Sequence, residues 1–314
     1  MGGIKTLIAI NIVLMTVLSA LYFFKPPTPT PRVSSKIDQS SNRIFVQKND
    51  SIDFYELLRA ELGEDAPKFA VYFMRPKLDK VPVIFQSRPM RPASMIKVFV
   101  MAKAMFDAKH GMLSLDEPLT ITSENVVGGA GSIAGEGIGA KVSVRQAIEH
   151  MIVESDNTAT NLLIDRLGME NLNRYLRDNG YQDTIFNHKM MLEKDKTNLS
   201  SARDLGLLFT RIYRRECVDD FYDWMMVNYL LRQEDTDCFP AALPYWNIAH
   251  KTGEVIGLYD DGGIFYGASG DFVLVIMNDD IDGREETIER MKAITIKAAL
   301  TLDRSNEDGQ KNFR

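Results

Sequence analysis

Polar and apolar residues follow two different periods along the chain. Residues 51–63 carry apolar side chains at helical spacing between an N-cap Ser and a terminal Gly, which predicts a helix. Two β-rich runs, 68–75 and 81–88, are separated by a short polar turn. This pattern predicts an antiparallel hairpin directly after the first helix.

From about residue 93 to residue 240 the apolar positions repeat mostly every 3.6 residues. Helices are predicted at 94–108, 144–153, 158–167 and 201–215. Strand character returns at 247–255, 263–266 and 271–277, and a last helix is predicted at 285–302. Strands at both ends of an α-rich middle indicate an α/β fold of the α+β type: one antiparallel sheet flanked by helices, with an inserted all-helical lobe.

A run of 18 uncharged residues, 7–24, lies near the N-terminus between Lys5 and Lys25. As a helix it would span roughly 27 Å, close to the hydrocarbon thickness of a bilayer, which favours a single-pass membrane anchor. The alternative is a signal peptide that is cleaved before secretion, although its apolar core is usually shorter. Residues 25–50 are rich in Pro and Ser and predict a stiff linker, which leaves residues 51–314 as one domain.

Charge divides at the same boundary. The chain has a net charge of −6, but residues 1–50 carry +4 and the remainder carries −10. An acidic body repels phosphate backbones, so nucleic acid is not predicted as a partner. The four His and two Cys show no metal-ligand spacing, so neither a metal nor another cofactor is expected.

Two short motifs place chemistry-bearing side chains on the predicted helices. In the first, SMIK at 94–97, positions i and i+3 share one helix face, so the Lys97 amine can lie beside the Ser94 hydroxyl. The second is SDN at 155–157, between two helical runs. There Ser155 can relay a proton and the Asn157 amide can hold a substrate.

The third motif is KTG at 251–253, inside a predicted strand. The cation of Lys251 and the hydroxyl of Thr252 can bind a substrate carboxylate, while Gly253 permits close backbone approach. Each motif alone has an ordinary structural explanation: a capped helix with a surface lysine, an N-cap cluster or a strand-edge turn. The ordered set SxxK, SDN, KTG favours catalysis.

On these motifs and their surroundings, MIVESDNTATNLLIDRLG and HKTGEVIGLYDDGGIFYG, the chain resembles the class A β-lactamases and the related penicillin-binding proteins. The resemblance implies an acyl-serine enzyme whose substrate is a small β-lactam or a peptidoglycan peptide. It implies Ser94 as the nucleophile, Lys97 as its activating partner and Ser155 as the proton shuttle to the leaving nitrogen. The backbone N–H groups of Ser94 and Glu254 would form the oxyanion hole.

One departure from the family pattern concerns hydrolysis of the acyl-enzyme. Class A enzymes use a Glu in an ExxLN loop, and no such motif occurs between residues 157 and 251. Glu193 is the single Glu in the corresponding stretch, 184–204, and is the candidate deacylation base. Two Met and a Leu precede it, and a solvated loop carboxylate is the favoured interpretation because a general base needs specific geometry.

Three functions therefore stay open. The chain is predicted to be a monomeric β-lactamase-type hydrolase, a D-alanyl-D-alanine peptidase with slow deacylation, or a non-catalytic module that binds β-lactams or cell-wall peptides. Intact Ser94, Lys97, Ser155 and Lys251 argue against the last, since a pure binder needs no activated nucleophile. The anchor predicts an extracytoplasmic domain tethered to the membrane through residues 7–24.

Overall fold

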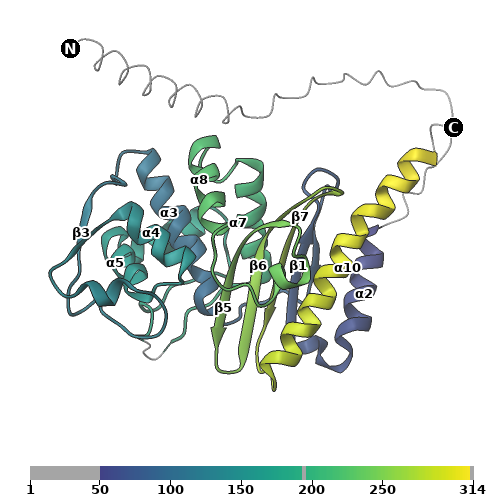
Figure 1. Cartoon of the computed structure of the whole chain (residues 1–314), viewed down its shortest axis with the longest axis horizontal. Coiled ribbons are helices and arrows are strands. Elements are labelled where there is room, and N and C mark those ends of the chain that lie inside the picture. The colour runs from purple at the N-terminus through teal and green to yellow at the C-terminus, as the bar shows by residue number, and fades with distance from the viewer. Residues whose placement is uncertain (1–49, 193–195, 312–314) are drawn as a thin grey trace, which may run out of the picture. The chain divides into compact units, whose positions relative to one another are not determined.

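The central sheet forms where β-branched and aromatic residues gather in short runs. The computed structural model describes residues 50–192 and 196–311. Its five-stranded sheet consists of β1 (Phe69–Met74), β2 (Val83–Phe85), β5 (Asn247–Val255), β6 (Leu258–Gly267) and β7 (Gly270–Asn278). The order is β2-β1-β7-β6-β5 and all neighbours are antiparallel (Figure 1). The strand that carries KTG, β5, is therefore an edge strand.

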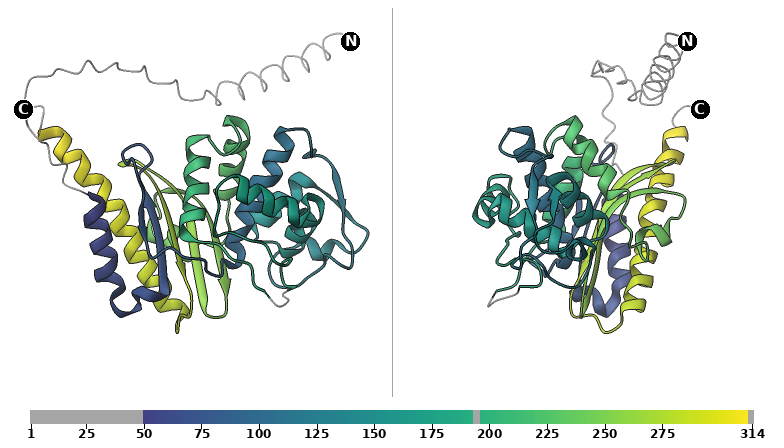
Figure 2. Two further views of the ribbon diagram at one scale, coloured as in Figure 1. Left: turned by 180° about the vertical axis from the view of Figure 1, so that it is seen from behind. Right: turned by 60° about the vertical axis from the view of Figure 1, so that its left-hand side comes forward.

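Helices cover both faces of this sheet. Successive side chains of a strand point to opposite faces, so Tyr72 of β1 joins one hydrophobic core and Phe73 joins the other. The core around Phe73 is closed by α2 (Asp50–Leu62) and α10 (Arg284–Lys311), which lie side by side in both views of Figure 2. On the opposite face, α7 (Ala202–Arg214) packs against β1, β6 and β7.

The segment between β2 and β5 contains α7 and the helical lobe. The helices of the lobe are α3 (Lys97–Lys109), α4 (Val144–Val153), α5 (Asn157–Leu167), α6 (Met169–Asp178) and α8 (Asp220–Leu230). The short helix α9 (Phe239–Ala242) follows the lobe and packs against α10, and its Phe239 joins the core around Phe73. The lobe also holds a two-stranded ribbon of β3 (Pro118–Thr120) and β4 (Lys141–Ser143). Short 3-10 turns occur at η1 (Gly63–Lys68), η2 (Ala93–Ile96) and η3 (Ile133–Glu136).

Helix starts in the lobe are set by side-chain caps. Ser143 and Gln146 form a reciprocal capping box at the start of α4. Asp156 caps α5, Ser201 caps α7 and Asp219 caps α8. These caps fix where each helix begins, and one of them, Asp156, lies between Ser155 and Asn157 of the predicted site.

The predicted fold class is confirmed. The α+β order, the single antiparallel sheet and the inserted helical lobe are all present. The helix predicted at 94–108 begins differently, because residues 93–96 form a 3-10 turn and α3 starts at Lys97. The lobe contains the ribbon of β3 and β4 in addition to its helices.

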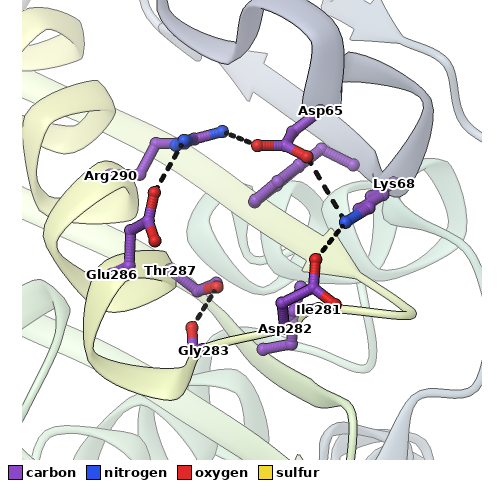
Figure 3. Close-up of a pocket in the computed structure, with 9 residues that line it drawn as sticks. Asp65, Lys68, Ile281, Asp282, Gly283, Glu286, Thr287 and Arg290 are labelled. Carbon is purple, nitrogen blue, oxygen red and sulfur yellow. Dashed lines mark hydrogen bonds and ion pairs between the residues drawn. The ribbon is translucent and has the colours of Figure 1, made fainter.

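An ion-pair cluster joins η1 to the start of α10 (Figure 3). Arg290 Nη1 lies 2.6 Å from Asp65 Oδ2, and Lys68 Nζ lies 2.9 Å from Asp282 Oδ2. Arg290 also faces Glu286 at 3.3 Å. Solvent screens these exposed and partly exposed pairs, so they add little to stability, but they link η1 to the start of α10.

The described residues belong to one compact unit. Between residues 50 and 192 and between 196 and 311, no helix combines the length and the apolar character that crossing a bilayer requires. The predicted anchor at 7–24 and nearly all of the predicted linker at 25–50 lie outside the described residues. Glu193 also lies outside them.

Candidate active site

Ser94 lies on a short turn that joins the sheet to α3. Residues Ala93–Ile96 form η2, and in a 3-10 helix positions i and i+3 lie one above the other. Lys97 Nζ accordingly lies 3.0 Å from Ser94 Oγ. Ala93, immediately before the serine, has a φ of 41°, in the left-handed region that residues with a Cβ rarely adopt. Such strain is typical of functional sites, where the surrounding packing sustains it.

The Lys97 amine is fully buried among polar atoms of the SDN motif. Its Nζ lies 3.1 Å from Ser155 Oγ, 2.5 Å from the Ser155 carbonyl oxygen and 2.8 Å from Asn157 Oδ1. Burial and then the charge of Lys251 hold the pKa of Lys97 well below its ordinary value, against an opposing effect of Asp156. A neutral amine here can accept the proton of the Ser94 hydroxyl.

A second buried amine, that of Lys251, faces the same serine of the SDN motif. Lys251 Nζ lies 3.0 Å from Ser155 Oγ and 2.9 Å from the Thr252 carbonyl oxygen. Burial lowers the pKa of Lys251 to about 8, and the carboxylates of Asp235 and Asp261 oppose that shift. Ser155 is therefore held between two amines, and it too has a left-handed φ, of 59°.

The SDN motif acts both as a helix cap and as part of the site. Asp156 Oδ1 accepts the N–H of Ala159 at 2.7 Å, and Asp156 Oδ2 accepts the N–H of Ile133 at 2.7 Å. A Cβ on Gly131 would lie 2.1 Å from Asp156 Oδ2. Only glycine therefore lets the backbone at residue 131 lie this close to the Asp156 side chain. Asn157 Nδ2 donates to the carbonyl of Gly128 at 3.1 Å, which directs Asn157 Oδ1 toward Lys97.

The KTG strand lies directly against the Ser94 turn. A Cβ on Gly253 would lie 2.6 Å from the carbonyl oxygen of Pro92, so only glycine lets β5 come this close. The Glu254 side chain is exposed and pairs with Arg284 at 2.8 Å. The expected role of Glu254 in the oxyanion hole concerns its backbone N–H and does not involve this carboxylate.

The loop after α6 closes one side of the site. Asn161 of α5 holds its backbone, because Asn161 Oδ1 accepts the N–H of Met190 at 2.8 Å and Asn161 Nδ2 donates to the Met190 carbonyl at 3.2 Å. A cavity of about 280 Å³ opens here, next to the nucleophile turn. It is lined by Arg91, Pro92, Ala93, His188, Met190, Met191, Thr197, Asn198 and Val255.

All the predicted site residues that the structure describes converge on this junction between β5 and the lobe. Sequence reasoning missed Asn161 and a second amide residue, Gln233, whose Nε2 atom lies 3.3 Å from Thr252 Oγ1. Neither belongs to a tripeptide motif, so the sequence carries no local signal for them. No group of three His, Cys, Asp or Glu side chains in residues 50–192 and 196–311 is arranged to hold a metal ion.

The sheet with its helical lobe and the Ser–Lys–Ser–Lys constellation at their junction define a serine hydrolase of the β-lactamase and penicillin-binding class. The model of the Beta-lactamase enzyme family matches residues 53–300. The chain belongs to this family.

Solved structures agree on the fold. PBP-A is 24% identical, covers 83% of this chain and 97% of its own, and has a TM-score of 0.71. A variant of PBP-A in an acyl-enzyme complex with penicillin G matches with 24% identity, the same coverages and a TM-score of 0.70. A β-lactamase from Sphaerobacter thermophilus DSM 20745 is 20% identical over 79% of this chain and 95% of its own, with a TM-score of 0.71. No curated protein matches the chain.

Proposed function

We propose that this hydrolase forms an acyl-enzyme at Ser94 with β-lactams or with D-alanyl peptides of the cell wall, and releases the acyl group slowly. The observation that carries the proposal is the continuous series of contacts from Ser94 through Lys97 and Ser155 to Lys251, with every step between 3.0 and 3.1 Å. A nucleophile, a base and a proton relay within hydrogen-bond reach are the requirements of acyl transfer.

In the proposed reaction, neutral Lys97 takes the proton of Ser94 as Oγ attacks the substrate carbonyl. The backbone N–H groups of Ser94 and Glu254 stabilise the oxyanion, an effect worth about 3 kcal/mol per donor in comparable sites. Ser155 passes a proton to the leaving nitrogen as the C–N bond breaks, and the neighbouring amines resupply it. Lys251 and Thr252 bind the substrate carboxylate.

Slow release is proposed because the described part of the loop brings no free carboxylate to Ser94. Among the described residues of 184–204 the one acid is Asp204, which is buried and bound to Thr184 and Arg203. Asp156 adjoins Ser155, but backbone N–H groups bind both its oxygens. Fast turnover by a β-lactamase of the class A type is the second candidate, and it would rest on Glu193 as the base.

A chromogenic cephalosporin tests the proposal. We expect a burst of one equivalent of product followed by a much slower steady state, and a covalent adduct on Ser94 by mass spectrometry. Ser94→Ala should abolish the burst and the adduct. Sustained turnover that depends on Ser94 would establish a β-lactamase instead, and failure of Ser94 to be labelled would leave only a binding module.

We also propose that the domain works as a monomer outside the cytoplasm, tethered through residues 7–24. The length and apolarity of that run support a membrane anchor, and a cell-wall substrate would be met there. The contacts from Ser94 through Lys97 and Ser155 to Lys251 are made within one chain, so a monomer suffices for the proposed chemistry. Recovery of the chain in a washed membrane fraction would support the anchor, whereas recovery of a shortened form in the medium would indicate signal cleavage.

A further inference from the structure

The hydroxyl of Thr252 has a neighbour that the motifs do not predict. Gln233, which follows α8, lies with its Nε2 atom 3.3 Å from Thr252 Oγ1. Both residues are more than nine-tenths buried, with 7% and 5% of their surface exposed. The contact joins the helical lobe to the strand at the point where a substrate carboxylate is expected to bind.

The hydrogen bond made by the amide oxygen of Gln233 determines the orientation of the amide group. Gln233 Oε1 accepts the N–H of Asp235 at 3.3 Å, so it is the NH₂ group that faces Thr252. An amide NH₂ only donates hydrogen bonds. Thr252 Oγ1 must therefore accept this bond, and its own hydrogen is left for a different acceptor.

The backbone around Gln233 is fixed relative to the proton relay. The N–H of Gln233 bonds to the Leu230 carbonyl at 3.4 Å, and the N–H of Glu234 bonds to the Val153 carbonyl at 3.1 Å. Val153 ends α4, two residues before Ser155. The position of Gln233 is therefore fixed relative to Ser155 as well as to Thr252.

Arg284 and Asp235, two charged groups near this contact, already have partners. Arg284 binds Glu254 and Asp237, each at 2.8 Å, and the Asp235 carboxylate accepts the Tyr259 hydroxyl at 3.2 Å. Lys251 faces Ser155 from the same strand as Thr252. The substrate carboxylate would therefore meet the Lys251 amine and the Thr252 hydroxyl.

We propose that Gln233 is a positioning residue: by donating to Thr252, it turns the hydroxyl hydrogen of Thr252 toward the carboxylate of the substrate. The inference rests on the proposed acylation of Ser94 and on the proposed binding of the substrate carboxylate by Lys251 and Thr252. Gln233 itself touches no reacting atom.

The test compares benzylpenicillin with its methyl ester, which lacks the negative charge. The second-order rate constant for acylation of Ser94 is measured for both compounds in the full-length chain. Gln233→Glu keeps the side-chain shape but places an acceptor against Thr252, which turns the hydroxyl hydrogen inward. We expect acylation by benzylpenicillin to fall roughly 10- to 100-fold, the range for a hydrogen bond to a charged group, while acylation by the ester changes little.

Two further variants separate positioning from other effects. Thr252→Val should show the same carboxylate-selective loss, and adding Gln233→Glu to it should cost nothing more, because the hydroxyl is already gone. A further loss in the double variant would mean that the new charge simply repels the substrate, and would overturn the proposal. Gln182→Glu, an exposed site in the loop after α6, introduces the same charge as a control and should retain wild-type selectivity.

The remaining outcomes are also decisive. Equal losses for penicillin and ester in Gln233→Glu, together with a lower melting temperature, would show that Gln233 has only a structural role. Gln233→Met, which removes the donor without adding charge, should give a smaller loss with the same selectivity for the carboxylate. If the wild-type chain reacted with neither compound, the proposed function would be overturned and the role of Gln233 with it, whereas a reactive wild type with unselective variants would overturn the role of Gln233 alone.

Discussion

The two buried lysines differ in the protonation state that the proposed reaction needs. Lys97 must be neutral to take the Ser94 proton, and burial together with the charge of Lys251 lowers its pKa. Lys251 must be charged to attract a carboxylate, and its pKa is lowered only to about 8. Burial thus lowers both pKa values, and at Lys97 the charge of Lys251 lowers the pKa further.

This difference predicts a bell-shaped pH profile for acylation. The rate should rise as Lys97 loses its proton and fall as the pH passes about 8, where Lys251 loses its charge. Lys251→Arg keeps the charge at all these pH values, so the alkaline fall should disappear while the acid limb stays. Stopped-flow acylation with a carboxylate-bearing β-lactam measures both limbs. An unchanged alkaline limb in the arginine variant would assign that limb to another group.

Met190 lines the cavity beside the Ser94 turn, which makes it a position at which a deacylation base can be introduced. Its backbone is fixed by Asn161, and it lines the cavity that also contains Ala93, the neighbour of the nucleophile. Met190→Glu should speed release of the penicilloyl group roughly tenfold, below the 10²–10⁴ of a tuned general base, because the loop is not shaped for it.

Mass spectrometry of the adduct over time measures this release. Met190→Gln has nearly the same shape but no basic group, so its adduct should persist as long as that of the wild type. Equal acceleration in both variants would mean that any polar residue admits water. In that case deacylation would be limited by access rather than by a missing base.

At the level of elements, α7 can lie on the sheet only because residue 206 has no side chain. A Cβ on Gly206 would lie 2.1 Å from the ring of Tyr72 in β1. Tyr72 cannot move aside easily, since it is buried and its hydroxyl lies 3.0 Å from Thr210 Oγ1 on the same helix. Gly206→Ala should therefore reduce the free energy of unfolding by about 1–3 kcal/mol, the usual cost of overpacking.

Denaturant unfolding measures this loss, with Gly135→Ala as the matched control. A Cβ at Gly135 meets nothing within 4 Å, and its φ is not in the left-handed region. Its stability should stay within about 0.5 kcal/mol of the wild type, as for most surface changes. Similar stability for both variants would show that α7 can shift away from the sheet at little cost.

Elements with strong periodicity could be predicted from the sequence nearly residue by residue. The helix at 144–153 and the strand at 247–255 have the predicted bounds, because a capping box and a run of strand-forming residues act locally. The order of the strands and the 3-10 turn at Ser94 could not be predicted, since both depend on packing between distant segments. Gln233 and Asn161 were missed for the same reason: each meets its partner only after the lobe has folded onto the sheet.

For the whole molecule, the position of α2 determines where the domain can be cut. Phe54, Leu58 and Leu62 are buried in the core around Phe73, and the ring centroids of Phe54 and Phe73 lie 4.3 Å apart. Exposing three such side chains would cost roughly 5–9 kcal/mol at about 1.5–3 kcal/mol each, comparable with the entire stability of a domain.

A chain of residues 50–314 should therefore melt at the same temperature as the full-length protein, and penicillin should acylate it at the same rate. It should be recovered in the soluble fraction, whereas the full-length protein is expected in the membrane fraction. A chain of residues 64–314, which lacks α2, should show no cooperative melting transition because one face of the sheet is exposed. Calorimetry, penicillin labelling and fractionation of the three chains measure these outcomes. If residues 50–314 failed to fold, the segment before residue 50 would have to contribute to the core, and its role would extend beyond tethering.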